Sequence, residues 1–318
     1  MAGTLNQALG VGEALQRLAG EDGLSLPRLR RSHVGDSWLS ALPVLGSLLA
    51  PTVVVSCGTS GERKGRRLKL ARPSLVWAHV EVPKAVGMAP DINAIPAHDW
   101  TDDLTRSNTL VIQGVPHRIR SVDLEPLRRP SRQALGRGEG EPVALFLIGG
   151  PNEAFDFGAG FLPTLRQRTR DAAEAGFLVI LLASRRTPTA VRQWLRELAG
   201  PHVICADGKQ VLAYRDYLAA ADRIFVTEDS ISMTCETVAS RRPVSWLPLQ
   251  PRDNPRLAKF RRFQERWRPL LFDPTDFAVA NPAVMADIPD DTTLIASEIR
   301  TVLRRRGVWP PVHPLQEQ

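Results

Sequence analysis

The sequence predicts an α/β protein built from two Rossmann-like, doubly wound domains. Its 318 residues suit two domains, since a typical domain holds roughly 150 residues. Two uninterrupted apolar runs, 142–148 (PVALFLI) and 177–183 (FLVILLA), have the composition of parallel strands that are buried on both faces. Segments of helix-forming composition separate such runs, and this repeated alternation predicts parallel sheets covered by helices.

The second half of the chain shows the alternation most clearly. Between the apolar runs, 160–175 has helix-forming composition, and 189–198 places Val191, Trp194 and Leu195 on one helical face. The next expected elements are a strand at 202–205, a helix at 211–220, a strand at 223–226, a helix at 230–239 and a strand at 244–247. Together they predict one doubly wound sheet.

The first half carries weaker signals of the same kind. A helix is expected at 9–18, followed by strands at 52–56, 75–80, 91–95 and 109–112. A doubly wound domain normally opens with a strand and a glycine-rich turn, whereas this chain begins almost directly with the helix.

The predicted domain boundary lies in the segment 120–141. This segment is rich in Arg, Pro, Gly and Glu and shows little periodicity, which predicts a linker. We therefore expect one domain over 1–135 and a second over 136–318, with a final helix at 292–306 that returns to the first domain.

The net charge of +7 favours anionic partners. Basic residues gather at 28–31, 63–72, 259–268 and 300–306. These clusters lack interleaved aromatic residues, and the chain has no helix-turn-helix, zinc-finger or RNP-type motif, so nucleic acid is not expected as a partner. Nucleotide or lipid phosphates fit the charge, and solvated helix faces are the simpler alternative.

Cysteine and histidine usage argues against a structural metal. Cys57, Cys205 and Cys235 are too scattered for a disulfide framework or a metal site, and the six histidines form no metal-binding pair. No apolar run approaches the roughly 20 residues of a transmembrane helix, and no secretory signal is visible. We therefore expect a cytoplasmic protein without a resident metal.

Small and hydroxylated residues follow three expected strands of the second half. In parallel sheets, ligands bind at the carboxyl ends of strands, where helix N-termini favour phosphate. Glu236 suits ribose hydroxyls, whereas Asp229 and Ser230 fit either phosphate binding or simple capping of the helix. Arg185 and Arg186 can fork onto phosphate oxygens, although only one of them is expected to point inward. The candidate nucleotide-binding residues are Gly149, Gly150, Asn152, Ser184, Arg185, Arg186, Thr187, Thr227, Asp229, Ser230, Ser232, Met233 and Glu236.

Two histidines follow strands of the first half. His98 stands beside Asp99 after the strand at 91–95, and His117 follows the strand at 109–112. A histidine beside a carboxylate suits a general base, so His98, Asp99 and His117 are the candidate catalytic residues. Hydrogen-bonding roles in turns fit both histidines equally well.

Two familiar nucleotide motifs are missing. The glycine-rich, basic segment 58–65 follows an expected strand but lacks the GxxxxGK[ST] spacing, which disfavours nucleoside-triphosphate hydrolysis. No GxGxxG motif occurs at a first strand-to-helix turn, which argues against NAD or FAD.

Several motifs, taken together, resemble those of the mitochondrial-fission Elm family. They are 6–10 (NQALG), His98-Asp99, 114–119 (GVPHRI), 148–152 (IGGPN), 184–188 (SRRTP), 227–233 with Glu236, and 259–263 (KFRRF). The resemblance covers nearly the whole chain. It implies a B-type glycosyltransferase fold, in which two Rossmann-like domains face a cleft, similar to the enzyme that adds N-acetylglucosamine to lipid-linked peptidoglycan precursor. It also implies that Glu236 holds the nucleotide ribose and that 227–232 holds the diphosphate.

The sequence departs from the family pattern at its start. Family members usually carry a strand and a glycine-containing loop ahead of the Asn-Gln pair, and here only Ala2-Gly3-Thr4 corresponds to that segment. Two explanations are open: the loop on the acceptor side departs from the family pattern, or the start codon is misplaced.

Two functions follow as hypotheses. The first is metal-independent transfer of a sugar from a nucleoside-diphosphate sugar, with no permanently bound cofactor, to an envelope saccharide or lipid-linked acceptor. In this hypothesis 1–135 is the acceptor side and 136–318 binds the nucleotide sugar. The alternative is a non-catalytic adaptor, because plant members of the family recruit a fission GTPase to mitochondria. Such an adaptor would bind protein or membrane through basic surfaces, for example peripherally at the inner face of the cytoplasmic membrane.

Overall fold

The computed structural model describes residues 2–24, 53–84, 88–207, 212–275, 277 and 287–309. The chain forms two compact units: unit 1 is Met1–Arg118 with Pro289–Gln318, and unit 2 is Ile119–Ile288. Each unit has its own parallel sheet and apolar core, as the sequence predicts. The basic cluster at 28–31 and the first residue of the helix expected at 211–220 lie outside the described residues.

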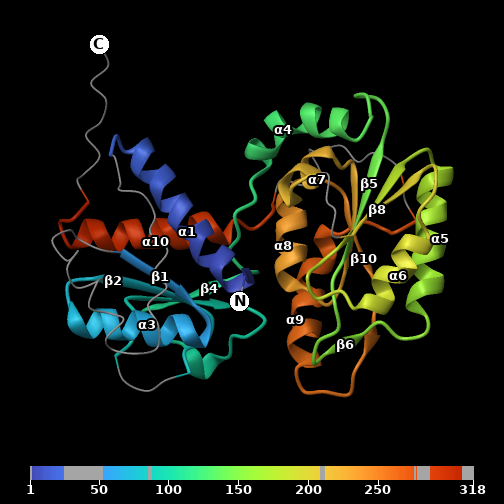
Figure 1. Ribbon diagram of the computed structural model, residues 1–318. Helices are drawn as coiled ribbons and strands as arrows, with labels where there is room; N and C mark the ends of the chain where they lie inside the picture. Colours follow the sequence, from blue (N-terminus) through green and yellow to red (C-terminus); the bar gives the residue numbers. More distant parts are fainter. Residues whose placement is uncertain are drawn as a thin grey trace, which may run out of the picture. The chain divides into compact units, whose positions relative to one another are not determined.

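Unit 1 contains a four-stranded parallel sheet in the order β1-β2-β3-β4. Its strands are β1 (Val53–Cys57), β2 (Val76–Val80), β3 (Ile92–Pro96) and β4 (Thr109–Ile112), with a short 3-10 helix η2 (Asp102–Leu104) before β4. Helices α1 (Ala2–Glu21) and α10 (Asp291–Arg305) cover one face of the sheet, and α3 (Gly58–Ala71) covers the other (Figure 1). Val11 and Leu15 of α1 and Ile295 and Ile299 of α10 pack into the same apolar core.

The first turn of α10 fastens the loop that follows β4. Asp291 accepts hydrogen bonds from the backbone N–H groups of Gln113 at 2.8 Å and Gly114 at 2.6 Å. The Thr292 hydroxyl accepts from the N–H of His117 at 2.9 Å. Burial raises the pKa of Asp291, and the two backbone donors offset part of that rise. Helix α10 is therefore an integral part of unit 1.

Helix α3 was not predicted, and the sequence singled out 58–65 only as a glycine-rich, basic segment after a strand. Gly65 lies against Trp77 of β2, and a Cβ atom at Gly65 would lie 2.2 Å from the Trp77 Nε1. Trp77 is fully buried and donates from Nε1 to the Ser56 hydroxyl at 2.8 Å. The glycine thus lets a strongly basic helix approach the sheet closely, and it does not form a turn.

Unit 2 contains a five-stranded parallel sheet in the order β10-β9-β5-β7-β8. The strands are β5 (Val143–Ile148), β7 (Leu178–Ala183), β8 (Val203–Ala206), β9 (Arg223–Thr227) and β10 (Val244–Leu247). The helices are α4 (Ser121–Ala134), α5 (Phe161–Glu174), α6 (Thr189–Glu197), α7 (Tyr214–Ala220), α8 (Ile231–Ala239), α9 (Leu257–Trp267) and the 3-10 helix η3 (Arg268–Leu270). Strands β6 (Phe155–Asp156) and β11 (Gln250–Pro251) pair antiparallel beside this sheet.

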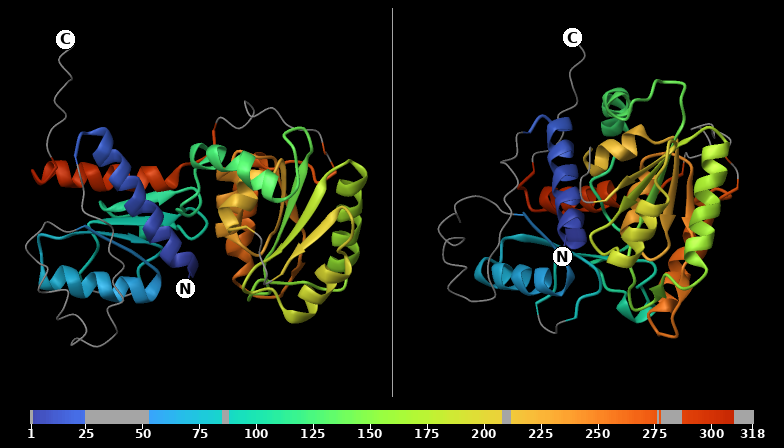
Figure 2. Two further views of the ribbon diagram at one scale, coloured as in Figure 1. Left: turned by 45° about the horizontal axis from the view of Figure 1, so that its top comes forward. Right: turned by 45° about the vertical axis from the view of Figure 1, so that its right-hand side comes forward.

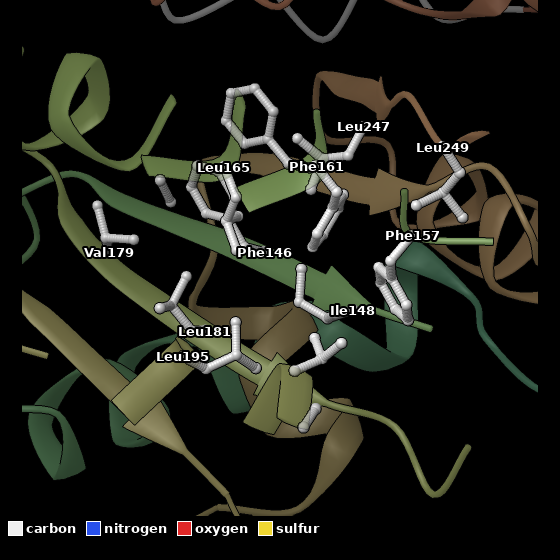
Figure 3. Packing of buried hydrophobic residues seen from close by; sticks show 14 of the residues in the cluster. Phe146, Ile148, Phe157, Phe161, Leu165, Val179, Leu181, Leu195, Leu247 and Leu249 are labelled. Atoms are coloured by element: carbon white, nitrogen blue, oxygen red, sulfur yellow. The ribbon is translucent and has the colours of Figure 1, made fainter. Parts of the chain in front are cut away.

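The core of unit 2 lies between the sheet and helices α5 and α6. Phe146 and Ile148 of β5 and Leu181 of β7 pack with Leu165 of α5 and Leu195 of α6 (Figure 3). Helices α7 and α8 lie on the other side of the sheet (Figures 1 and 2). The strands of both parallel sheets lie within one residue of the positions expected from the sequence, whereas β6 and β11 were not expected.

The predicted linker at 120–141 is wrong, because it contains helix α4. The buried side of α4 is largely polar, which an apolar pattern does not reveal. Arg132 is buried and donates to the carboxylate of Asp222 at 2.8 Å and to the Ala220 carbonyl at 3.1 Å. Arg128 also pairs with Asp222 and donates to the Ala219 carbonyl at 3.2 Å. These bonds complete the C-terminus of α7 and place α4 in unit 2, so the units meet at Arg118 and not at 135.

No helix in the described ranges combines the length and apolar character needed to cross a membrane.

Candidate functional site

The order of the strands in unit 2 creates a topological switch point. The chain passes from β5 to β7 and β8 on one side of the sheet and then returns to β9 and β10 on the other side of β5. The loops that follow β5 and β9 are therefore neighbours at the carboxyl edge of the sheet. Open parallel sheets bind their ligands at this point.

The two loops are joined by direct hydrogen bonds. The Gly149 N–H donates to the Thr227 hydroxyl at 2.8 Å, and the Gly150 N–H donates to the Asp229 carboxylate at 3.1 Å. The Asn152 amide donates to the Asp229 carbonyl at 2.9 Å. The backbone donors of both glycines are therefore used inside the protein.

Both glycines are needed for close packing of the loops. A Cβ atom at Gly149 would lie 2.2 Å from the Asp229 carboxylate, and one at Gly150 would lie 2.2 Å from the Arg186 carbonyl. The role of both glycines in nucleotide binding stays a prediction, and in the structure their missing side chains make room for Asp229 and the loop after β7.

The loop after β7 separates the two predicted arginines. Thr187 is buried, donates from its hydroxyl to the Gly149 carbonyl at 2.6 Å, and accepts from the Ser184 N–H at 2.9 Å. Arg186 donates to the Asp229 carboxylate at 2.7 Å. Arg185 is exposed and forms no polar contact within the described part of the chain. Of the two, Arg185 is therefore the guanidinium available to a ligand.

Asp229 is a buried anion that organises all three loops. Its side chain is 0% exposed, and it accepts from the Gly150 N–H, the Thr227 hydroxyl at 2.6 Å and Arg186. Burial raises the pKa of this carboxyl, and the three donors offset part of the rise. Asp229 therefore maintains the shape of the edge and does not cap helix α8.

The N-terminus of α8 opens at this edge. Ser230 is the N-cap, and its hydroxyl accepts from the Met233 N–H at 3.3 Å. The N–H groups of Ile231 and Ser232, the first two helical residues, have no partner within a helix by geometry. The Ser232 hydroxyl has no partner among the described residues. These donors, together with the positive end of the helix dipole, suit an anion.

Glu236 lies one turn beyond Ser232, on the same face of α8. It is half-buried, and its Oε2 accepts from the Tyr214 hydroxyl at 2.9 Å. Burial raises the pKa of Glu236 from 4.5 to about 7, against the lowering effect of the Tyr214 hydrogen bond. A carboxylate at this position can accept hydroxyl groups of a sugar.

Tyr214 is the site residue that sequence reasoning missed. It is the first residue of α7, and burial followed by the nearby Glu236 raises the pKa of its hydroxyl well above 10. Nothing in the local sequence pairs it with Glu236, because the contact joins two separate helices.

The predicted catalytic residues lie in unit 1, at the carboxyl edge of its sheet. His98 is buried after β3, with its Nε2 3.7 Å from the Asp99 carboxylate. His117 follows β4. Its N–H donates to the Thr292 hydroxyl at 2.9 Å, and its carbonyl accepts from the same hydroxyl at 3.1 Å. Their catalytic role stays a prediction. In the described ranges, no group of three or more His, Cys, Asp or Glu side chains is arranged to hold a metal ion.

The fold has clear counterparts among solved structures. S. aureus MnaA, in a co-structure with UDP, aligns with a TM-score of 0.54 and 11% identity over 98% of this chain and 96% of that one. A Listeria monocytogenes protein provisionally assigned as UDP-N-acetylglucosamine 2-epimerase aligns with a TM-score of 0.52 and 13% identity, over 92% of this chain and 86% of that one. At such identities the likeness shows the fold alone, which is of the B-type glycosyltransferase kind.

Comparison with curated protein sequences finds no match. The family described as mitochondrial fission ELM1 matches residues 2–303, nearly the whole chain, and the protein therefore belongs to that family.

Proposed function

We propose that the protein transfers a sugar from a nucleoside-diphosphate sugar, and that unit 2 binds this donor. The observation that carries the proposal is Glu236, a half-buried carboxylate one turn beyond the open N-terminus of α8, at the switch point of the sheet. The carboxylate suits ribose hydroxyls, and the helix end suits a diphosphate. Since ribose and diphosphate are adjacent in a nucleoside diphosphate, one ligand can reach both groups.

The charge of the leaving diphosphate can be balanced without a metal. The helix N-terminus, the Ser232 hydroxyl and the exposed Arg185 supply donors and positive charge at one edge. Fixed donors of this kind stabilise charge that develops as the sugar–phosphate bond breaks.

Unit 1 supplies the acceptor side in this proposal. An acceptor hydroxyl attacks the anomeric carbon, the bond from that carbon to the diphosphate oxygen breaks, and the hydroxyl proton passes to a base. His98 with Asp99, and His117, are the candidates for this base. The proposed acceptor is an envelope saccharide or a lipid-linked saccharide.

Calorimetric titration with UDP, GDP, CDP, ADP and their common sugars tests the proposal, with UDP first because a structural counterpart was solved with it. We expect one nucleotide to bind, and Glu236→Gln to weaken it about tenfold at about pH 8, since a neutral amide replaces a charged acceptor. Glu197→Gln, at an exposed site on α6, is the matched control. A nucleotide that binds Glu236→Gln and Glu197→Gln with equal affinity would show that Glu236 does not contact it. If no nucleotide binds up to about millimolar concentration, the proposal is rejected.

The adjacent arginines predict different defects. Arg185→Ala is expected to weaken nucleotide binding about tenfold and leave the thermal stability unchanged, because Arg185 is exposed and forms no polar contact with the described residues. Arg186→Ala is expected to lower the free energy of unfolding by about 1 to 3 kcal/mol, because Asp229 is buried and loses its cationic partner. Calorimetry and thermal melts of both variants check this. A stability loss in Arg185→Ala, with a binding loss and unchanged stability in Arg186→Ala, would contradict it.

The rival function is that of an adaptor, and helix α3 favours it. Arg63 and Arg67 are exposed on α3, and Leu70 beside them is 58% exposed. A basic face with a protruding apolar side chain suits a protein or an anionic membrane surface. If no nucleotide binds, this surface becomes the place to search for a partner.

A further inference from the structure

The contact between Tyr214 and Glu236 joins two helices at the candidate site. Tyr214 begins α7 and Glu236 lies in the middle of α8, and the phenol donates to the carboxylate Oε2 at 2.9 Å. The other carboxylate oxygen, Oε1, has no hydrogen-bond partner among the described residues. One oxygen is thus fixed by the protein, and the other can accept a ligand hydroxyl.

We propose that Tyr214 is a positioning residue for nucleotide-sugar recognition, which fixes the Glu236 carboxylate through Oε2 so that Oε1 accepts a hydroxyl of the bound ribose. This inference rests on the proposed function, because it assigns a role within the same site.

The phenol is suited to this role because it is always a donor. Burial and the neighbouring carboxylate raise the pKa of Tyr214 well above 10, so the hydroxyl keeps its proton at every pH at which the protein works. The same hydrogen bond favours the ionised form of Glu236, whose pKa burial raises to about 7. Tyr214 therefore orients the carboxylate and also helps to keep it charged.

A purely structural role for the contact is the competing explanation. Helix α7 is already held at its C-terminus by Arg128 and Arg132, and Tyr217 and Leu218 anchor it in the core. At its N-terminus, Asp216 accepts from the Ala213 N–H at 3.3 Å. The Tyr214 hydroxyl is therefore not needed to fasten the helix.

Charged groups on the neighbouring elements are engaged with other partners. They are Arg215 with Asp123, Asp216 with the Ala213 N–H, Arg223 with Ser245 and the Asp273 carbonyl, Glu228 with Gln264 and the Leu249 N–H, Asp229 with Arg186, and Arg242 with Glu125. Burial and the Tyr214 hydrogen bond are the causes of the shift in the pKa of Glu236.

Tyr214→Phe provides the test, with Tyr217→Phe as the matched control in the same helix. The pKa of the Glu236 carboxyl is measured by carbon-13 NMR in the free full-length protein, and nucleotide affinity is measured from about pH 6 to about pH 9. Loss of the donor is expected to raise the pKa of Glu236 by about one unit, so that affinity near neutral pH falls about 5 to 10-fold. At about pH 9 the carboxylate is ionised in both proteins, and a smaller loss of affinity is expected to remain because the carboxylate is no longer fixed. Tyr217→Phe is expected to leave both curves unchanged.

Several outcomes separate the explanations. An unchanged Glu236 pKa in Tyr214→Phe, or an affinity that equals that of the wild type at about pH 9, overturns the positioning role. If the wild-type protein binds no nucleotide, the proposed function fails, while the carboxyl titration still decides whether Tyr214 controls Glu236.

Discussion

Replacing Asp222 with alanine is expected to lower the free energy of unfolding of unit 2 by about 3 to 5 kcal/mol. Asp222 pairs with both Arg128 and Arg132 and accepts from the Val143 N–H at 2.8 Å. The Arg132 side chain is only 2% exposed. Its charge would therefore stay buried without a counter-ion, and the first N–H of β5 would lose its acceptor.

The pH dependence of this effect follows from the pKa of Asp222. Burial opposes ionisation, but hydrogen bonds from Arg132, Val143 and Arg128 outweigh it and hold the pKa below 3.8. A lowered pKa in the folded state adds stability above the unfolded value, and that stability is lost as the pH falls through the folded value. The difference between wild type and variant should therefore narrow below about pH 4.

Hydrogen exchange of peptides that cover β5 and α7 measures this effect within unit 2. Asp171→Ala is the matched control, because Asp171 forms a partly exposed i,i+3 pair with Arg168. The control should cost no more than about 0.5 kcal/mol. Equal protection in the two variants would mean that the Asp222 cluster contributes no more than a surface pair.

The second large effect is expected for Gly149→Ala, which should lower the free energy of unfolding by about 3 to 4 kcal/mol. The new Cβ would lie 2.2 Å from the Asp229 carboxylate. Asp229 cannot move aside without breaking its bonds to Gly150, Thr227 and Arg186. The free-energy cost of overpacking therefore adds to the cost of a weakened buried ion pair.

Gly160→Ala is the matched control in the same unit. A Cβ at Gly160 meets nothing within 4 Å, and the backbone there is right-handed helical, with φ −77° and ψ −14°. The control is expected to be neutral or to stabilise by about 0.4 to 1 kcal/mol. Urea unfolding of both variants checks this, and a tolerated Gly149→Ala would show that the three loops are loosely packed.

Strands β5 and β7 could be predicted from sequence because each one is a continuous apolar run. Strands such as β5 and β7 are buried on both faces, so their residue types alone identify them. Helices α3 and α4 escaped prediction for opposite reasons. Gly65 in α3 allows close contact with a tryptophan, so a glycine marks a helix. The buried face of α4 includes an arginine that binds the end of another helix, so it lacks an apolar pattern.

The candidate site was predictable in position but not in detail. Strand order places the loops with Gly149, Ser184 and Thr227 at one edge, as expected for a parallel sheet. Which groups remain available depends on partners distant in sequence. Asp229 forms an ion pair with Arg186, so that Arg185 remains available, and Tyr214 donates a hydrogen bond to one oxygen of Glu236. Neither interaction is visible in a local sequence motif.

The return of α10 to unit 1 also sets an order of events during synthesis. Unit 2 is one continuous stretch, so it is complete as soon as its last residue has left the ribosome. Unit 1 waits for Ile295 and Ile299 to fill its core and for Asp291 to bind the loop after β4. The part of the chain that is made first is therefore the last to finish folding, and until then the apolar face of α1 lacks the packing that α10 supplies.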